Sequence, residues 1–360
     1  TAALGLLQPS LAAGDAVARR AWLALGGPPR ALAAGCLSPA SGAELARGEP
    51  YAKELRLLQY VRETAAPGDI EAILGAVEAF GVGTLPETSH WLKVAGGAKA
   101  AVLQEAARRS ASGLALEIGT YCGYSAIAIA HERRQQQRRA SDFRQRGAPL
   151  VLSIEADAAH AAIARNVLAF AGMLHEVEVL TGHSEDVLPW VLQRLAHASL
   201  SVDLLFMDQR GSRYEADLRS VIDAGVLGTA ALVVADNVLK PGAPAFLWLI
   251  SHSDCFETEV LSVPEFAMPG VEDWMTMSTY SPQPPLEASS QRSTAPRPLA
   301  PSPPPAVREL EWRAERMRAR THAPDSGGLG VDFVEWSKFS AAMRRDVLGA
   351  GLVATTSERW

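Results

Sequence analysis

Leu114-Ala-Leu-Glu-Ile-Gly-Thr-Tyr-Cys-Gly-Tyr-Ser125 has the form of a buried strand that ends in a glycine turn and opens a helix. Gly119 and Gly123 carry no side chains where the backbone must turn tightly and lie close to a ligand. The loop reads Glu-x-Gly-x-x-x-Gly and lacks the Gly-x-Gly-x-x-Gly of dinucleotide-binding proteins. The carboxylate of Glu117 suits a ligand with a cationic amino-acid end, which points to S-adenosylmethionine. A strand-turn-helix without a ligand is the alternative.

A second acidic strand end lies at Glu155. The stretch 150–155 is short, apolar and β-branched, and it follows the glycine loop by one strand–helix unit. A carboxylate at the end of the second strand of a doubly wound sheet can accept hydrogen bonds from both ribose hydroxyls of a cofactor. We therefore expect Glu155 to hold a ribose, with a solvated strand-end glutamate as the alternative.

Helical and strand-like patterns alternate from Tyr51 to about Tyr280. Helices are expected over 53–65, 69–80, 96–110, 124–134, 157–171, 185–196, 213–224 and 243–252. Strands are expected over 114–118, 150–155, 177–181, 203–208, 230–236, 256–263 and 274–280. This alternation predicts an α/β fold with a doubly wound, mostly parallel sheet, in which ligands bind beyond the carboxyl ends of the strands.

Oxygen donors stand at two further strand ends. Asp208 closes Asp-Leu-Leu-Phe-Met-Asp, and Asp236 and Asn237 close Ala-Ala-Leu-Val-Val-Ala-Asp-Asn. Three hard oxygen ligands at one sheet edge, without cysteine or histidine, favour magnesium over zinc. The alternative is that Asp236 and Asn237 only begin a turn before Pro241.

The composition limits the class of protein. A net charge of -6 over 360 residues gives no electrostatic footprint for nucleic acid. The six arginines between Arg133 and Arg146 are interpreted as a solvated polar insertion, with an anion or partner contact as the alternative. Three scattered cysteines favour a reduced, intracellular and cytoplasmic protein, and no apolar run is long enough for a membrane span. The acid-poor segment 1–48 leaves organelle targeting open, beside a flexible extension.

The composition changes after Tyr280. We divide the chain into an N-terminal extension (1–50), a catalytic domain (51–280), a Pro/Ser-rich linker (281–306) and a helical appendage (307–360). Two helices, 307–320 and 333–348, flank a loop that weakly resembles an EF-hand. That loop is too short and lacks inner carboxylates, so we expect a calcium-free hairpin that could bind a protein partner.

These motifs together resemble the catechol O-methyltransferase family over most of 53–280. The matching segments are Glu117–Ser125, Ser153–Glu155, Gly182–Asp186, Asp208 with Arg213 and Tyr214, and Asp236–Phe246. The resemblance implies a seven-stranded, Rossmann-like methyltransferase fold, S-adenosylmethionine, magnesium and a small catechol-type acceptor.

The resemblance also implies roles for individual residues. The implied cofactor contacts are Gly96, Glu117, Gly119, Tyr121, Ser125, Glu155, Ser184, Glu185 and Asp208. The implied metal ligands are Asp208, Asp236 and Asn237. The implied walls of the substrate slot are Trp91 and Pro241, with Glu265 on the second catechol hydroxyl.

One departure from the family pattern affects catalysis. The family's metal-binding Asp is followed by His-Trp-Lys, the Lys being the proposed general base, whereas this chain reads Gln209-Arg210-Gly211. Lys240 is a candidate substitute, although a surface lysine is the interpretation we favour, and Arg210 in place of an aromatic wall would open the slot or favour an anionic acceptor. Two functions follow: an active magnesium-dependent O-methyltransferase, or a cofactor-binding pseudo-enzyme or interaction protein.

Overall fold

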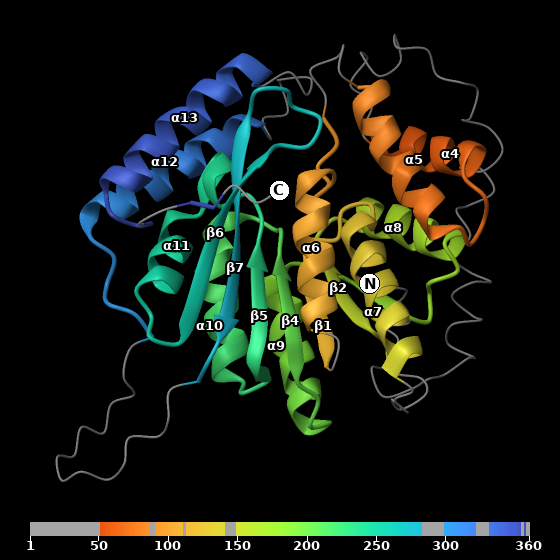
Figure 1. Ribbon diagram of the computed structural model, residues 1–360, viewed down its shortest axis with the longest axis horizontal. Helices are drawn as coiled ribbons and strands as arrows, with labels where there is room; N and C mark the ends of the chain where they lie inside the picture. Colours follow the sequence, from red (N-terminus) through yellow and green to blue (C-terminus); the bar gives the residue numbers. More distant parts are fainter. Residues whose placement is uncertain are drawn as a thin grey trace.

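The computed structural model describes residues 51–85, 91–110, 113–140, 149–282, 299–321, 331–353 and 356–357. Its centre is one seven-stranded sheet in the order β3-β2-β1-β4-β5-β7-β6 (Figure 1). The strands are β1 (Leu114–Ile118), β2 (Val151–Glu155), β3 (Val177–Thr181), β4 (Val202–Met207), β5 (Leu227–Ala235), β6 (Phe256–Pro264) and β7 (Glu272–Tyr280). Strands β1 to β5 pair in parallel, and β7 runs antiparallel to both β5 and β6. The expected doubly wound, mostly parallel fold is confirmed.

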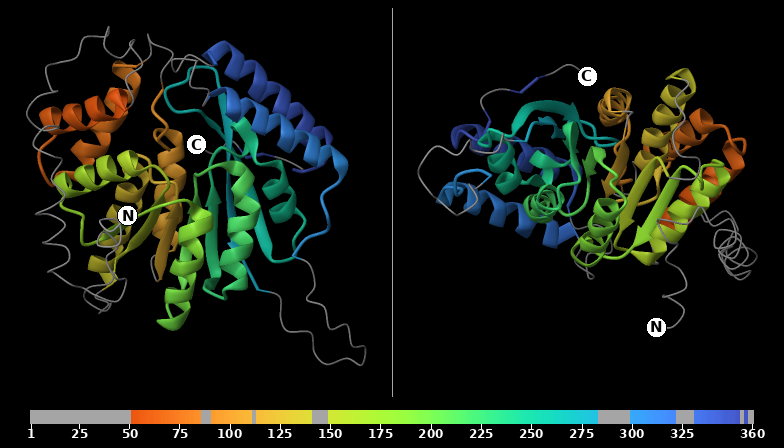
Figure 2. Two further views of the ribbon diagram at one scale, coloured as in Figure 1. Left: turned by 180° about the vertical axis from the view of Figure 1, so that it is seen from behind. Right: turned by 90° about the horizontal axis from the view of Figure 1, so that it is seen from below.

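Helices cover both faces of the sheet (Figure 2). One face packs against α4 (Ala52–Thr64), α5 (Ile70–Gly83), α6 (Ala98–Arg109), α7 (Tyr124–Ala140) and α8 (Ala158–Phe170). The other face packs against α9 (Ser184–His197), α10 (Tyr214–Asp223) and α11 (Pro244–Ser251). Each face therefore buries its own hydrophobic cluster, as a doubly wound sheet requires.

The central strand β1 ends at the point where the chain reverses its direction of winding. All five of its residues are buried, because β2 and β4 flank it and helices cover both faces. Gly119 follows at φ 103°, and a Cβ there would lie 2.5 Å from the carbonyl oxygen of Asp208. Only glycine permits this approach, which brings the ends of β1 and β4 together at the topological switch point.

The described elements agree with the predicted ones to within a few residues at their ends, with one correction at the arginine run. Helix α7 continues to Ala140, so part of that run is helical. Arg133 is fully buried, forms an ion pair with Asp203 and donates to the carbonyl oxygen of Gly113 at 2.9 Å. The interpretation of Arg133 as solvated was wrong, because its stem packs in the core while its head meets a carboxylate and backbone carbonyls.

The predicted C-terminal hairpin consists of α12 (Pro305–Thr321) and α13 (Phe333–Gly349). Both helices pack beside α11 and the β6–β7 end of the sheet (Figures 1 and 2). The EF-hand-like loop and most of the predicted linker and N-terminal extension lie outside the described residues.

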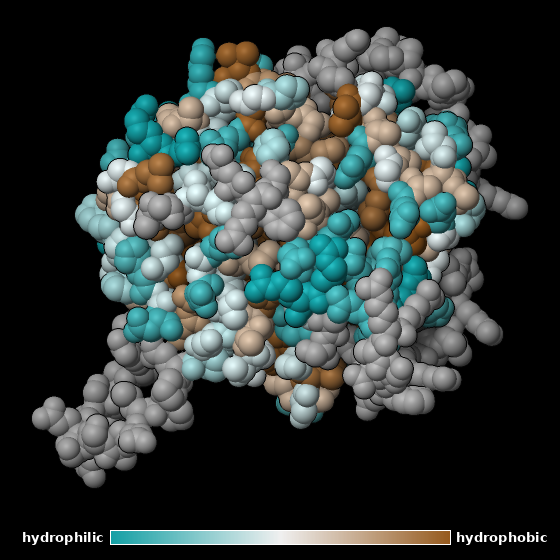
Figure 3. All heavy atoms as spheres, in the orientation of Figure 1, coloured by the Kyte–Doolittle hydropathy of each residue, from teal (hydrophilic) through white to brown (hydrophobic). Residues whose placement is uncertain are grey.

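The described surface in Figure 3 is mostly polar, with apolar atoms in small scattered groups on the face that is drawn. None of the described helices is both long enough and apolar enough to cross a membrane.

Candidate active site

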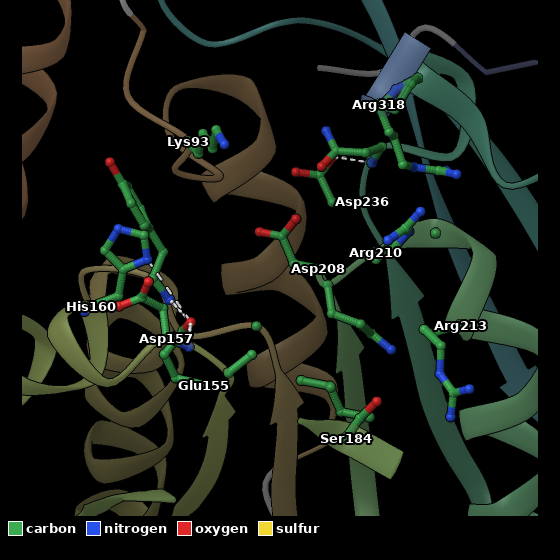
Figure 4. Close-up of a pocket in the computed structure, with 18 of the residues that line it drawn as sticks. Lys93, Glu155, Asp157, His160, Ser184, Asp208, Arg210, Arg213, Asp236 and Arg318 are labelled. Carbon is green, nitrogen blue, oxygen red and sulfur yellow. Dashed lines mark hydrogen bonds and ion pairs between the residues drawn. The ribbon is translucent and has the colours of Figure 1, made fainter. Parts of the chain in front are cut away.

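A cavity of about 770 Å³ opens beyond the carboxyl ends of the parallel strands (Figure 4). Its residues come from the ends of β1, β2, β4 and β5, from the start of α9, and from the hairpin. This is the position at which a doubly wound sheet binds its ligand. The size suits a nucleoside-sized cofactor together with a small acceptor.

The β1–β2 side of the cavity is built around Glu155. Its Oε2 accepts from the backbone N–H of Tyr121 at 2.7 Å, and its Oε1 accepts from the N–H of Asp157 at 2.8 Å. The Tyr121 ring packs edge-on against His160, with 4.8 Å between the ring centroids. The two backbone donors fix the carboxylate at the cavity wall while each oxygen keeps a free lone pair.

The predicted cofactor residues divide into two groups. Those that line the cavity are Gly119, Tyr121, Glu155, Ser184, Glu185 and Asp208. The others are buried and are not among the lining residues: Gly96, Glu117 and Ser125. Burial raises the pKa of Glu117 to about 7, against a hydrogen bond donated by Ser153.

The glycine predicted in the cofactor-covering loop has a packing role. A Cβ at Gly96 would lie 2.9 Å from the ring of Phe266, so the absence of a side chain lets the loop before α6 lie against that ring. This close packing against Phe266 is sufficient to account for a glycine at position 96, without a contact to the cavity.

The three predicted metal ligands meet at the β4–β5 side of the cavity. Asp208, Asp236 and Asn237 all line it. The Asp208 carboxylate makes no hydrogen bond or ion pair with any described residue, and burial together with the charge of Asp236 raises its pKa well above the usual value. Burial also raises the pKa of Asp236 to about 6, although Lys99 opposes the shift. The two acids therefore repel each other in a partly dry site.

Lys99 is the buried centre of the acidic cluster. Its Nζ lies 2.9 Å from Asp236 Oδ1, 3.0 Å from Glu265 Oε2 and 2.9 Å from Asp273 Oδ2. Burial would lower the pKa of Lys99, but these three carboxylates raise it well above the usual value. Asn237 joins the same network, because its Nδ2 donates to Asp273 at 2.8 Å.

The predicted substrate residues lie together at the same end of the cavity. Trp91, Pro241 and Glu265 all line it, and Lys240 lies between them. Lys240 is only 4% exposed, and its Nζ is 3.0 Å from Glu265 Oε2. Burial would raise the pKa of Glu265, but Lys240 and Lys99 lower it to about 2. The interpretation of Lys240 as a surface lysine was wrong.

Lys93 is a cavity residue that sequence reasoning missed. It lies at the upper edge of the cavity in Figure 4, between the Glu155–His160 side and the Asp236 side. Among the described residues no carboxylate forms an ion pair with it. Lys93 is an exposed residue at the cavity edge, yet the protein atoms around its ammonium group, together with the charge of Lys53, lower its pKa to about 8.

The hairpin contributes a wall of the cavity. Arg318, Ala319 and Thr321 come from α12, and Trp336 comes from α13. Arg318 donates to the carbonyl oxygen of Gly242 and pairs with Glu315 at 2.6 Å. The sequence carries no motif that assigns Lys93, His160, Arg318 or Trp336 to the cavity, so these residues were not predictable from local pattern.

Within the described residues, no three His, Cys, Asp or Glu side chains are grouped as a metal site. Of the three predicted metal ligands, Asp208 and Asp236 offer carboxylates, and the third oxygen donor is the side-chain amide of Asn237. Its two carboxylates and that amide do share one cavity wall.

Comparison with known proteins places the chain among methyltransferases. A family model described as "Methyltransferase domain" matches residues 116–238. The chain is 33% identical to mouse catechol O-methyltransferase over 205 residues, which are 57% of this chain and 70% of that protein. It is 31% identical to the bovine catechol O-methyltransferase over 57% of this chain and 68% of that protein. It is also 31% identical to a mouse "Transmembrane O-methyltransferase homolog", over 63% of this chain and 81% of that protein.

Proposed function

The chain belongs to the catechol O-methyltransferase family, and from that membership we propose that it transfers the methyl group of S-adenosylmethionine to a hydroxyl of a catechol-type acceptor held by magnesium. One observation carries this proposal. The acids Glu155, Asp208, Asp236 and Glu265, from separate parts of the chain, line a single cavity together with Trp91.

The β1–β2 side of the cavity is the proposed cofactor site. When bound, S-adenosylmethionine supplies a methyl group on a positively charged sulfur. Glu155 can accept hydrogen bonds from the ribose hydroxyls, because its backbone donors leave lone pairs facing the cavity. Ser184 and Glu185 line the adjoining wall at the start of α9, where the adenine is expected. Glu117 and Ser125 would act from behind that wall by holding the glycine loop.

The β4–β5 side fits a divalent cation. Around it stand the carboxyl groups of Asp208, Asp236, Glu265 and Asp273 and the ammonium groups of Lys99 and Lys240. The raised pKa of Asp208 shows that this site disfavours a further negative charge, and a bound divalent cation would relieve that penalty. Asp208 has no partner among the described residues. We assign Asp208, Asp236 and Asn237 as the ligands. When bound, magnesium lowers the pKa of a hydroxyl that it contacts.

Trp91, Pro241 and Glu265 form the proposed acceptor side. The Lys99 and Lys240 ammonium groups keep Glu265 ionised, so it can accept a hydrogen bond from the second catechol hydroxyl. Trp91 and Pro241 provide apolar contact for the acceptor ring. Fixing one hydroxyl and the ring plane brings the reacting oxygen towards the methyl carbon, which supplies much of the rate.

Lys93 is the proposed general base. Lys99 and Lys240 are each engaged in ion pairs with buried carboxylates, whereas Lys93 has no such partner among the described residues. A pKa of about 8 gives Lys93 a neutral fraction at physiological pH. The acceptor oxygen forms a bond with the methyl carbon while the carbon–sulfur bond breaks, and the phenolic proton passes to Lys93. Lys240 instead positions Glu265.

The pseudo-enzyme alternative is not favoured. It rested on the loss of the family lysine at Gly211, but the cavity retains Lys93 and the metal-type donor set. A scaffold protein would have no need of Asp208 in an unpaired state.

Incubation with methyl-labelled S-adenosylmethionine tests the proposal. The acceptors are catechol, substituted catechols and the corresponding mono-phenols, each with magnesium and with excess chelator. We expect labelled product from catechols only, and only with magnesium. Labelling of mono-phenols at an equal rate in chelator would contradict the acceptor and metal assignments, and no labelled product at all would contradict the transfer activity.

A further inference from the structure

We propose that the α12–α13 hairpin is part of the acceptor-binding site, and that Trp336 on α13 binds the acceptor directly. The inference rests on the proposed function, because the acceptor is the catechol-type substrate. The family-model match ends at residue 238, well before the hairpin begins. Nevertheless Arg318 and Trp336 line the same cavity as Asp208 and Asp236.

The hairpin is docked firmly onto the catalytic domain. Met343 and Val347 of α13 are fully buried in the core cluster that includes α10 and α11. Glu311 of α12 accepts from the backbone N–H of Ala245 at 3.1 Å, and Ser337 donates to the carbonyl oxygen of Gly270 at 2.9 Å. Buried apolar contacts and hydrogen bonds to the backbone give a fixed wall, which is what a binding site needs.

The departure from the family pattern at 210–211 is explained by this docking. Arg210 pairs with Glu315 of α12, with 3.2 Å between Nε and Oε2. A Cβ at Gly211 would collide with the guanidinium of Arg318. Arginine at 210 therefore holds α12, and glycine at 211 makes room for it. The two residues that replace the family's aromatic wall and lysine accommodate a new wall.

Trp336 provides the aromatic surface of that wall. Its ring lies 6.0 Å from the ring of Trp91, edge to face, and Lys240 Nζ lies 4.5 Å from its centroid. Because the two rings meet edge to face and Lys240 lies over the Trp336 ring, Trp336 adds aromatic surface beside Trp91 at this end of the cavity, where a planar aromatic ring can pack. Trp336 thus takes over the ring contact that Arg210, whose side chain is 63% exposed, does not make.

Trp336 also offers a hydrogen-bond donor. The residue is 2% exposed, and its indole Nε1 is buried without a hydrogen-bond partner in the described part of the chain. A buried donor without a partner is unfavourable, so a bound molecule that accepts from it is favoured. The acceptor class is therefore an aromatic diol that carries a further oxygen as a hydrogen-bond acceptor, such as a carboxylate or carbonyl on the ring.

Ligand binding tests this without requiring turnover. The affinities of catechol and 3,4-dihydroxybenzoate are measured by calorimetry, with S-adenosylhomocysteine and magnesium present, for the wild type, Trp336→Phe and Trp312→Phe. Trp312 is the matched control, because it lies on the same hairpin but is 61% exposed. Trp336→Phe keeps a ring and removes the N–H. Trp336→Phe should lower the affinity for 3,4-dihydroxybenzoate about tenfold and the affinity for catechol less than about threefold. Trp312→Phe should change neither affinity.

Three outcomes are informative. If Trp336→Phe weakens the two ligands equally, or no more than Trp312→Phe does, the donor role of Trp336 is overturned. If Trp336→Phe lowers the affinity for 3,4-dihydroxybenzoate more than the affinity for catechol, as expected, but the wild type transfers no methyl group, the hairpin proposal stands and the proposed function fails. If the Phe variant is too unstable, Trp336→Tyr, which keeps a ring and a hydroxyl donor, should retain more discrimination than Trp336→Ala; equal losses would count against the proposal.

Discussion

Arg318 of α12 occupies the space into which any side chain at Gly211 would project. Its guanidinium donates to the carbonyl oxygen of Gly242 and pairs with Glu315, so it is held there by contacts on both sides. The family position for a catalytic lysine is therefore closed by a helix from outside the matched domain. The chemistry of that lysine has to come from elsewhere in the cavity.

Substitution of Gly211 is the direct test of this relationship. Gly211→Lys should not accelerate methyl transfer, because the lysine cannot take its place without displacing Arg318. Gly211→Ala should lower the free energy of unfolding by about 1–3 kcal/mol through overpacking, because the new Cβ displaces the guanidinium of Arg318 and lies 3.0 Å from the carbonyl oxygen of Gly242. Arg318→Ala should relieve the part of that loss that comes from Arg318 in the double variant. Thermal and denaturant unfolding measure this. Additive losses in the double variant would show that the two residues do not compete for the space.

Lys93 should govern the pH dependence of the rate. A base must be neutral to accept a proton, so methylation of catechol should rise as the pH increases through about 8, the pKa of Lys93 in the cavity. The groups that influence this value are Lys53, Glu54, Lys240 and Glu155. Lys93→Met should remove the rise and about 100-fold to 10,000-fold of the rate at neutral pH.

Lys93→Arg and Lys338→Met are the controls for that prediction. The arginine keeps a positive charge but cannot act as a base, so it should fail like the methionine variant. Lys338 is exposed on α13 and lies outside the cavity, so its loss should change nothing. A nitro-substituted catechol, whose hydroxyl ionises more easily, should lose less rate with Lys93→Met. An unchanged pH profile in Lys93→Met would exclude the base role.

Glu155→Ala should weaken binding of S-adenosylmethionine by ~1.5–3 kcal/mol, the range for hydrogen bonds to a charged group. Calorimetry measures the dissociation constant directly. Glu257→Ala, an exposed glutamate on β6, is the control and should bind with wild-type affinity. Undiminished affinity in Glu155→Ala would remove Glu155 from the ribose site.

Asp208 and Asp236 should respond differently to removal of charge. Asp208→Asn should abolish magnesium-dependent methylation with little change in the unfolding free energy, because its carboxylate has no partner among the described residues. Asp236→Asn should also abolish activity but should lower stability, since Lys99 loses one of its ion pairs. That loss should stay below the roughly 3–5 kcal/mol typical of an abandoned buried charge, because Asp273 and Glu265 remain.

Activity, titration with magnesium and thermal unfolding of both variants check this pair of predictions. Excess chelator on the wild type should reproduce the loss of activity without loss of cofactor affinity. Methylation by Asp208→Asn at the wild-type rate would contradict its role as a metal ligand.

The sheet, the glycine loop and the acidic strand ends were all predictable from local sequence patterns. Glu155, Asp208 and Asp236 were predictable because each closes a short apolar strand, and parallel strands of a doubly wound sheet end at one edge. The family resemblance then assigned Trp91 and Glu265 to the same cavity, where both lie.

The pairing of the buried charges and the docking of the hairpin depend instead on contacts between distant parts of the chain. Lys99 and Asp273 are 174 positions apart, and Arg318 and Gly242 are 76 apart, so no local periodicity connects them. The residues next to Lys240 in the sequence do not show that it is buried against Trp336, because Trp336 comes from a distant helix. Long-range packing sets such contacts, because the free energy of burying α12 and α13 against α11 and β7 belongs to the whole fold and to no single segment.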